Sequence, residues 1–520
     1  MLTYTTKTSA PPPPGAPTAS IRVVHGPLSD LESSDLQSFA HGGGVVLFTP
    51  APDSAPDVAL AGARITDVLP RTEWIVTLAD RPERVRLADE VPISSPVLTL
   101  QPTLDTAEVA ATTSIRFEHR PTILLRRHGA GTVITTGFDT AALRRHLVLG
   151  PFIQRLARPS FAPAATELGV AVIGYGPYGG MGYYHGLATT ETEGLALVAA
   201  ADTVPQRLDA ARVDFPNLVA HADGTSVAAD TNVDVAIVAT PPAFHAGLAL
   251  ELLRAGKHVV VEKPMCLTSA DAERLITTAQ EVERTITVHQ SRRWDQDWLA
   301  VRRVIAQDRI GEVFNIETFV GGFEHPCRAW HSEDSISGGA VYDWGSHHVD
   351  WILQLFGSAP QRLMCTAHTR VWLDTSNVDQ LSLWMQWADG REATFRQSDV
   401  CAIRRPKFHI EGTEGTLQGH YAPVTTHTIT PGRGYRNQVS HHAEAPVSLL
   451  LASYDGEHGL IESTIPPAPH PGWGFHQNLA NHLLLGEPLA VLPQQSLDVV
   501  RVLEAAHRSG ANGGELIELA

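Results

Sequence analysis

The segment VYDWGSHHVDW, residues 341–351, brings together side chains that can transfer protons or bind metal ions. In a helix, Asp343 and His347 share one face, Asp350 lies three residues further along the same side, and His348 points about a quarter-turn away. An imidazole titrates close to neutral pH and can act as a general base, whereas histidine and aspartate are also zinc ligands. The segment alone is therefore compatible with a proton relay, a metal site or the surface of a capped helix.

A lysine at the end of an apolar run is the second candidate. The run GKHVVVEKPM has the continuous hydrophobicity of a buried parallel strand and places Lys263 at its carboxyl end. Ligands of open α/β sheets bind outside the carboxyl ends of the strands. Lysine is also scarce in this chain, with four among 39 basic residues. We therefore expect Lys263 to take part in chemistry, the alternative being an ordinary surface ammonium group.

A glycine-rich turn predicts a dinucleotide site. In VAVIGYGPYGG, Gly174, Gly176 and Gly179 form G-x-G-x-x-G after a predicted strand and before a predicted helix. Such glycines allow a tight turn, close approach to a pyrophosphate and close helix packing. Asp202 ends the next apolar run, where a carboxylate can bind the ribose hydroxyls and disfavour a 2′-phosphate. We expect NAD, with NADP still possible because Arg207 is near.

The elements that must position these residues follow two patterns. From Leu168 the chain alternates apolar runs and helical segments, which predicts a doubly wound parallel sheet. Beyond Arg292, longer alternating segments such as DQLSLWMQWADGREATFRQS predict an antiparallel sheet with one covered face, followed by closing helices. Between Ile21 and Pro159, short apolar runs separated by turns predict a further α/β domain.

Several motifs together resemble the Gfo/Idh/MocA oxidoreductases, the family of glucose-fructose oxidoreductase and inositol dehydrogenase. They are VAVIGYGPYGG, AIVATPPAFH, GKHVVVEKP, GGAVYDWGSHHVD and IEGTEGTL, in this order over roughly 166–520. The resemblance implies an NAD(P)-binding Rossmann domain and an α/β domain whose open sheet forms the oligomer interface, with substrate between them.

The resemblance also implies roles for individual residues. The family pattern D-x-x-x-H corresponds to Asp343 and His347, with Lys263 as the third member. His347 is then the base for a hydroxyl proton, Asp343 orients it or binds a neighbouring hydroxyl, and Lys263 stabilises the developing alkoxide. The expected cofactor contacts are Gly174, Gly176, Pro177, Tyr178, Gly179, Asp202, Thr240, Pro241, His245, Glu262 and Lys263.

Substrate contacts are expected from the segments HQSRRWDQDW and CRAWHSED and from the second histidine of residues 341–351. They are Arg292, Trp294, Trp330, His331 and His348. Family members often have Trp-Arg where this chain has Trp330-His331, so a cationic contact there is in doubt. Aromatic rings and hydrogen-bonding groups suit a sugar or cyclitol. A zinc site normally needs more ligands and supporting partners than residues 341–351 offer, so we expect no metal ion.

The chain is expected to contain three domains after a tail. Residues 1–20 read as a disordered Pro-rich tail without a signal peptide, 21–160 as an accessory domain, 166–290 as the NAD(P)-binding domain and 291–520 as the substrate and oligomerisation domain. The accessory domain weakly resembles the class I glutamine amidotransferase-like fold of trehalose-utilisation proteins. No cysteine precedes Cys266, so the nucleophile of amidotransferases is missing and we expect no catalysis there.

Composition excludes some partners. A net charge of −17 disfavours nucleic-acid binding, and no apolar run is long enough to span a bilayer. Four scattered cysteines without CxxC spacing suit a reducing cytoplasm. We expect a homodimer or homotetramer that acts on a small molecule.

We expect an NAD(P)-dependent dehydrogenase that acts on a secondary hydroxyl of a sugar, glycoside or cyclitol. One alternative is a glycoside hydrolase or epimerase that uses NAD transiently through a keto sugar. Another is a nonenzymatic sensor of sugar or NAD, although such a protein would not need Lys263, Asp343 and His347 together.

Overall fold

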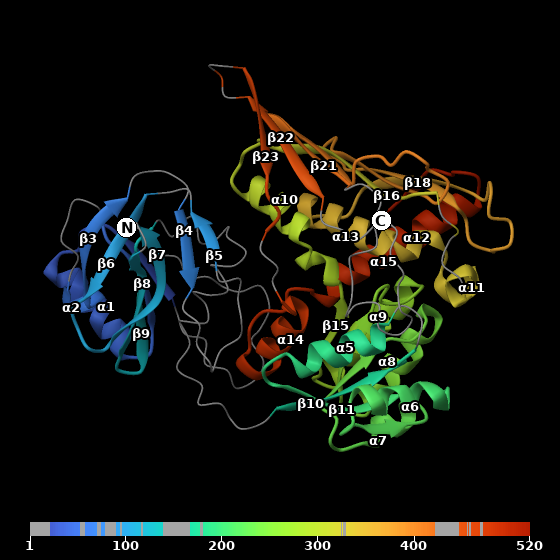
Figure 1. Ribbon diagram of the computed structural model, residues 1–520, viewed down its shortest axis with the longest axis horizontal. Coiled ribbons are helices and arrows are strands. Elements are labelled where there is room, and N and C mark those ends of the chain that lie inside the picture. Colours follow the sequence, from blue (N-terminus) through green and yellow to red (C-terminus); the bar gives the residue numbers. More distant parts are fainter. Residues whose placement is uncertain are drawn as a thin grey trace. The chain divides into compact units, whose positions relative to one another are not determined.

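Figure 1 shows the computed structural model of the chain. It describes residues 21–51, 58–69, 74–78, 90–93, 96–115, 118–138, 167–176, 180–323, 325, 329–421, 447–454, 456, 459–468 and 472–519. The Pro-rich tail and residues 139–166 lie outside these ranges. Two compact units are present, one formed by Met1–Thr166 with Pro469–Gly472 and Leu483–Gly486, and the other by the rest of the chain.

The first unit contains a seven-stranded sheet in the order β1-β2-β9-β8-β7-β4-β5. Strands β1, β2 and β9 pair in parallel, and the remaining neighbours are antiparallel. Helix α1 starts with a capping box between Ser29 and Glu32, and it buries Leu36 and Ala40 in the core of this unit. The elements are β1 (Ile21–His25), α1 (Asp30–His41), β2 (Val45–Thr49), α2 (Val58–Ala61), β3 (Ala63–Leu69), β4 (Trp74–Leu78), β5 (Glu90–Ile93), β6 (Val97–Pro102), β7 (Ala107–Ile115), β8 (Glu118–His128) and β9 (Gly131–Thr136).

The second unit begins with the predicted doubly wound sheet. Its six strands are all parallel in the order β12-β11-β10-β13-β14-β15. Strands β10, β13 and β14 are buried almost throughout, which explains their continuous apolar sequences. The elements are β10 (Leu168–Ile173), α5 (Met181–Thr190), β11 (Leu195–Ala201), α6 (Pro205–Asp214), β12 (Val219–His221), α7 (Gly224–Ala229), β13 (Val235–Val238), α8 (His245–Arg254), β14 (His258–Glu262), α9 (Ser269–Glu281) and β15 (Ile286–His289).

The same unit continues into a nine-stranded sheet in the order β23-β22-β21-β20-β16-β19-β18-β17-β24. It is mostly antiparallel, with a parallel pair β16–β19. Strands β18 and β19 alternate buried and part-exposed residues, so one face is covered, and helices α13 and α15 contact strands of this sheet (Figure 1). The strands are β16 (Val313–Gly321), β17 (Arg362–His368), β18 (Gln380–Gln386), β19 (Glu392–Ser398), β20 (Phe408–Gly412), β21 (Gly415–His420), β22 (Ser448–Tyr454), β23 (Leu460–Ile465) and β24 (Ile517–Glu518).

The helices that accompany the nine-stranded sheet position residues 341–351. Gly338 and Gly339 have positive φ and separate α11 from α12, and Gly357 ends α13 in the left-handed conformation. Asp343 is the last residue of α12 and His347 lies in the first turn of α13, with Trp344 between the two helices. The helices are α10 (Gln296–Ala306), α11 (Asp334–Ser337), α12 (Ala340–Asp343), α13 (Gly345–Phe356), α14 (Gly474–Leu485) and α15 (Pro493–Ala511).

This architecture confirms the predicted fold class, a parallel Rossmann sheet followed by a domain with a large, mostly antiparallel sheet. The predicted domain boundaries and the amidotransferase-like assignment of 21–160 stay predictions. Within the described residues, no helix combines the length and the apolar character needed to cross a membrane.

Candidate active site

Lys263 and Asp343 form an ion pair between the two domains of the second unit. Lys263 follows β14 directly, and its Nζ donates to Asp343 Oδ1 at 2.6 Å and to the Asp343 carbonyl at 3.3 Å. The side chains are 23% and 35% exposed, so both can still contact a ligand. The pair joins the carboxyl edge of the Rossmann sheet to the end of α12.

The charges around Asp343 keep it ionised. Burial by itself raises the pKa of the Asp343 carboxyl, but the positive charges of Lys263 and His331 outweigh burial and lower this pKa below its usual range. Arg292 acts in the same direction. Near neutral pH, Asp343 is therefore a carboxylate that holds the Lys263 ammonium group in place.

His347 is a neutral imidazole whose Nδ1 is available to bind a ligand. The residue is only 5% exposed, and its Nδ1 has no hydrogen-bond partner among the described residues. Burial lowers the pKa of His347 well below its usual value, and the charges of Lys263 and Arg292 lower it further. A ring in this state can accept a proton from a ligand hydroxyl.

Two of the expected substrate contacts, Arg292 and His331, lie near the ion pair of Lys263 and Asp343. The Arg292 guanidinium carbon lies 4.9 Å from the centre of the Trp344 ring and its Nη1 donates to Asp295 at 3.2 Å. His331 stacks on Trp330 with ring centres 3.5 Å apart. The side chains of Arg292 and His331 both lie close enough to Asp343 to help lower the pKa of its carboxyl.

Trp294 packs elsewhere than the sequence analysis expected. Its ring meets Phe475 edge-on at 5.9 Å, and a Cβ added to Gly474 would overlap it. It supports the start of α14. Trp344, which follows Asp343 in the chain and was not among the expected contacts, is the tryptophan whose ring contacts Arg292.

The packing of His348 argues against its predicted contact with substrate. The residue is 1% exposed, and its ring stacks on Phe395 at 4.7 Å and lies 4.8 Å from Trp351. It is a core residue. Asp350 is likewise engaged, because it accepts two hydrogen bonds from Arg293 at 2.9 and 2.5 Å.

Two glycines of the glycine-rich turn have the backbone conformation expected at a dinucleotide site. Gly174 has φ +90°, and a Cβ there would lie 2.8 Å from the backbone of Ala239. Gly176 has φ +48°, and the nearest atom that the described residues place beside an added Cβ, apart from the chain neighbours, is the Gly174 carbonyl oxygen at 4.0 Å. The predicted contacts Pro177, Tyr178 and Gly179 lie outside the described residues. Close packing of α5 is instead seen at Gly182, whose added Cβ would overlap the backbone of Tyr175.

Asp202 stands beside this turn. Its Oδ2 accepts from the Gly176 N–H at 3.0 Å, and its Oδ1 accepts from the Val204 N–H at 2.9 Å and from Arg207 at 3.3 Å. The carboxylate therefore lies where the sequence analysis expected a ribose contact. The adjacent guanidinium of Arg207 is the group that can accommodate a 2′-phosphate.

Thr240 and Pro241 follow β13 at the same edge of the sheet. The Thr240 hydroxyl oxygen is buried and has no hydrogen-bond partner among the described residues, as expected for a group that binds a ligand. His245, however, is fully buried, with Nε2 2.7 Å from the Thr240 carbonyl and Nδ1 2.8 Å from the Pro264 carbonyl. His245 thus joins two loops, and its predicted contact with the cofactor is not supported.

Glu262, whose cofactor contact stays a prediction, is engaged in hydrogen bonds within the protein. Its Oε1 accepts from His185 at 2.9 Å and from His289 at 2.6 Å, and its Oε2 accepts from the Lys263 N–H at 3.0 Å. Burial raises the pKa of Glu262, but the two histidines outweigh it and hold this pKa well below its usual range. No sequence pattern indicates this cluster, because its members come from distant segments of the chain.

Comparisons with known proteins agree with this geometry. The model of the oxidoreductase family with an NAD-binding Rossmann fold, Gfo/Idh/MocA, matches residues 168–290, and the model of its C-terminal domain matches residues 298–418. An uncharacterized oxidoreductase of Schizosaccharomyces pombe is 34% identical over 314 residues, which cover 58% of this chain and 85% of that protein.

A named relative and a solved structure extend this result. The scyllo-inositol 2-dehydrogenase (NADP(+)) IolW of Bacillus subtilis is 25% identical over 343 residues, covering 65% of this chain and 93% of that protein. A solved oxidoreductase from Klebsiella pneumoniae is 26% identical with a TM-score of 0.56, covering 68% of this chain and 95% of that one. The chain belongs to the Gfo/Idh/MocA family of oxidoreductases and is an NAD(P)-dependent dehydrogenase.

Proposed function

We propose that the enzyme transfers a hydride between the nicotinamide and a secondary hydroxyl carbon of a sugar, glycoside or cyclitol, with Lys263, Asp343 and His347 at the reacting centre. One observation carries the proposal: the ammonium group of Lys263 is fixed by Asp343 at 2.6 Å, and four residues after Asp343 the buried Nδ1 of His347 has no hydrogen-bond partner among the described residues. A cation and a neutral base are the two groups that alcohol oxidation requires.

Each of the three side chains has a distinct task in this proposal. A bound nicotinamide supplies the two-electron redox step. Lys263 donates a hydrogen bond to the substrate oxygen and stabilises its developing negative charge. His347 accepts the hydroxyl proton, and Asp343 keeps the ammonium group of Lys263 oriented. In the reductive direction, the protonated His347 returns the proton to the same oxygen.

The surrounding residues favour a polyhydroxylated ring as substrate. Trp344 packs beside Arg292 and Trp330 stacks on His331, so aromatic rings accompany the hydrogen-bonding groups of Arg292 and Asp343. Sugars and cyclitols combine apolar ring faces with hydroxyl edges, so both kinds of side chain are useful. The named relatives from Bacillus subtilis and Rhizobium meliloti, a scyllo-inositol 2-dehydrogenase and an inositol 2-dehydrogenase, support the same class.

The test is a screen for NADH and NADPH formation against a panel of sugars, glycosides and inositols. We expect net reduced cofactor with at least one of them, and His347→Asn should lower kcat by roughly 10²- to 10⁴-fold. The exposed His420 in β21 provides a matched control, and His420→Asn should leave kcat unchanged. Product formed without net reduced cofactor would instead indicate a transient keto sugar, and binding without turnover would indicate a sensor.

A further inference from the structure

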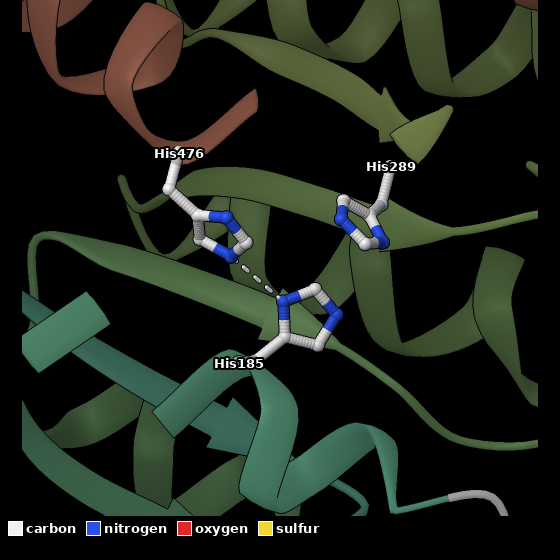
Figure 2. A group of neighbouring side chains, drawn as sticks. All are labelled: His185, His289 and His476. Atoms are coloured by element: carbon white, nitrogen blue, oxygen red, sulfur yellow. Dashed lines mark hydrogen bonds between the residues drawn. The ribbon is translucent and has the colours of Figure 1, made fainter. Parts of the chain in front are cut away.

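Three histidines meet at a point that the proposed reaction does not use. His185 lies in α5, His289 ends β15 and His476 lies in α14, and the three residues are 0%, 1% and 1% exposed. Figure 2 shows the three rings turned toward one another. His185 Nδ1 is 3.0 Å from His476 Nε2, and one nitrogen of each ring lies within 4.8 Å of the other two.

Glu262 fixes which nitrogens carry protons. Its Oε1 is 2.9 Å from His185 Nε2 and 2.6 Å from His289 Nδ1. A carboxylate only accepts, so these two nitrogens are the donors. In the neutral rings, the lone pairs are then on His185 Nδ1 and His289 Nε2, on the sides away from the carboxylate. This is the arrangement by which outer carboxylates orient metal-binding histidines.

Two of the remaining nitrogens have no partner. His289 Nε2 and His476 Nδ1 are buried and lack a hydrogen bond to any described residue. Leaving a polar atom buried in this way costs about 1–3 kcal/mol, so native structures usually provide a partner. Figure 2 shows one nitrogen of His289 facing the pair formed by His185 and His476. A cation among the three rings would satisfy that nitrogen.

We propose that His185, His289 and His476 bind a divalent transition-metal ion, Zn²⁺ in the first instance, with Glu262 orienting two of the three ligands. Zinc binds imidazole nitrogen at about 2.0–2.1 Å, which places tetrahedral ligands roughly 3.3 Å apart. The pair His185 Nδ1 and His476 Nε2 is already near that spacing. Rotation of the His289 ring brings in the third ligand. On binding, His476 carries its proton on Nδ1 and the His185–His476 hydrogen bond is replaced by two metal bonds.

The metal site would link three segments of the chain to one another and, through Glu262, to the candidate active site. Its ligands come from α5, β15 and α14, and Glu262 also accepts from the Lys263 N–H at 3.0 Å. The Tyr184 ring lies 5.5 Å from that of His289 and 6.0 Å from that of His476, and it lines the cluster with an apolar surface. The ion would therefore hold the segment that carries Lys263. This inference is independent of the proposed substrate.

Cobalt binding to the full-length protein, prepared without a polyhistidine tag and stripped with a chelator, tests the proposal. Co²⁺ is the probe because its tetrahedral complexes absorb visible light strongly. We expect one equivalent to produce these bands in the wild type and in the control His420→Asn. His289→Asn and His476→Asn should abolish them, and Glu262→Gln should weaken binding about 10- to 100-fold, as for other residues that orient metal ligands. Equal cobalt spectra in wild type and both ligand variants would overturn the proposal.

A second measurement avoids substitutions in a buried cluster. X-ray absorption at the zinc edge of the wild-type protein loaded with one equivalent of Zn²⁺ should show three imidazole nitrogens at about 2.0 Å. Absence of zinc binding at micromolar concentration, or a zinc environment without imidazole, would show that the cluster is a histidine–carboxylate network that binds no ion.

Discussion

His347 is buried beside two cations, and this determines how it should titrate. Burial lowers its pKa well below the usual 6.5, and Lys263 and Arg292 lower it further. The ring is therefore neutral at pH 7 and loses its capacity to accept a proton only when the pH falls through the lowered pKa. We expect kcat/KM for alcohol oxidation to stay level on the acid side of neutrality and to fall only well below pH 6.5.

Substituting Lys263 tests whether this residue sets the pKa of His347. Lys263→Met removes one of the lowering charges, so the acid limb of kcat/KM should move toward pH 6.5 while kcat falls. Lys257 is the matched control, because its ammonium group bonds to the carbonyls of Asp230 and Val233 instead. The assignment of His347 as base fails if the wild-type limb already lies at or above pH 6.5.

Only part of the candidate site was accessible from the sequence. The spacing of Asp343 and His347 placed them one turn apart, and the strand end placed Lys263 at the carboxyl edge. Spacing could not show that His348 packs on Phe395, because that depends on a strand some fifty residues later. It also could not reveal the cluster of His185, His289 and His476, whose members approach only in the folded chain.

The junction between β11 and α6 should govern cofactor choice. Asp202 is buried and accepts hydrogen bonds from the Gly176 and Val204 N–H groups, and Arg207 pairs with it from α6. Asp202→Ala removes the carboxylate that repels a 2′-phosphate and should shift preference toward NADP by about 10- to 100-fold, the value of a hydrogen bond to a charged group.

The partner substitution should act in the opposite direction. Arg207→Ala removes the group available to a 2′-phosphate, so the ratio of KM for NADP to KM for NAD should rise. Arg212, which pairs with Asp209 on the exposed side of α6, is the control, and Arg212→Ala should leave the ratio unchanged. Identical ratios in wild type, Asp202→Ala and Arg207→Ala would exclude this junction as the determinant.

Packing of α5 on the glycine-rich turn depends on one small residue. A Cβ at Gly182 would overlap the backbone of Tyr175, which cannot move without displacing the turn. Gly182→Ala should therefore destabilise the folded state by about 1–3 kcal/mol and weaken dinucleotide binding. Gly247 in α8 is the control, since an added Cβ there meets no atom within 4 Å and Ala should stabilise its helix by about 0.4–1 kcal/mol. Thermal unfolding of the two variants gives the comparison, and equal midpoints would contradict this packing argument.

Among the secondary-structure elements, the sequence predicted the two sheets but not the order in which all of their strands pair. Continuous apolar runs identified parallel strands such as β10 and β14 because both faces of that sheet are covered. Alternation identified β18 and β19. The parallel pairing of β16 with β19 leaves no local signal in the sequence, because it joins strands separated by two others along the chain.

Several buried histidines should make the stability of the whole molecule sensitive to acid. Burial lowers the pKa of His185 to about 4 and lowers the pKa of His347, His348 and His476 well below 6.5. Below pH 6.5 these groups take up protons in the unfolded chain before they do so in the folded one. The contribution of these histidines to the free energy of unfolding is therefore fully present above pH 6.5. It is lost as the pH falls toward their pKa values in the folded protein, by at most about 1.4 kcal/mol per pH unit for each histidine.

A second electrostatic effect opposes this loss and must be separated from it. The net charge of −17 at pH 7 approaches zero near the isoelectric point of about 5.8, which relieves self-repulsion on acidification. High salt screens repulsion between surface charges but leaves the cost of charging a buried ring. With a chelator present, the unfolding midpoint in high salt should fall between pH 7 and pH 5. His348→Leu replaces one buried titrating ring with an apolar side chain of similar size, so it should reduce the change of the midpoint with pH. Substitution of the exposed His420 by Asn should leave this change as it is in the wild type. A midpoint in high salt that stays level or rises over this interval would show that the buried rings do not govern the acid response.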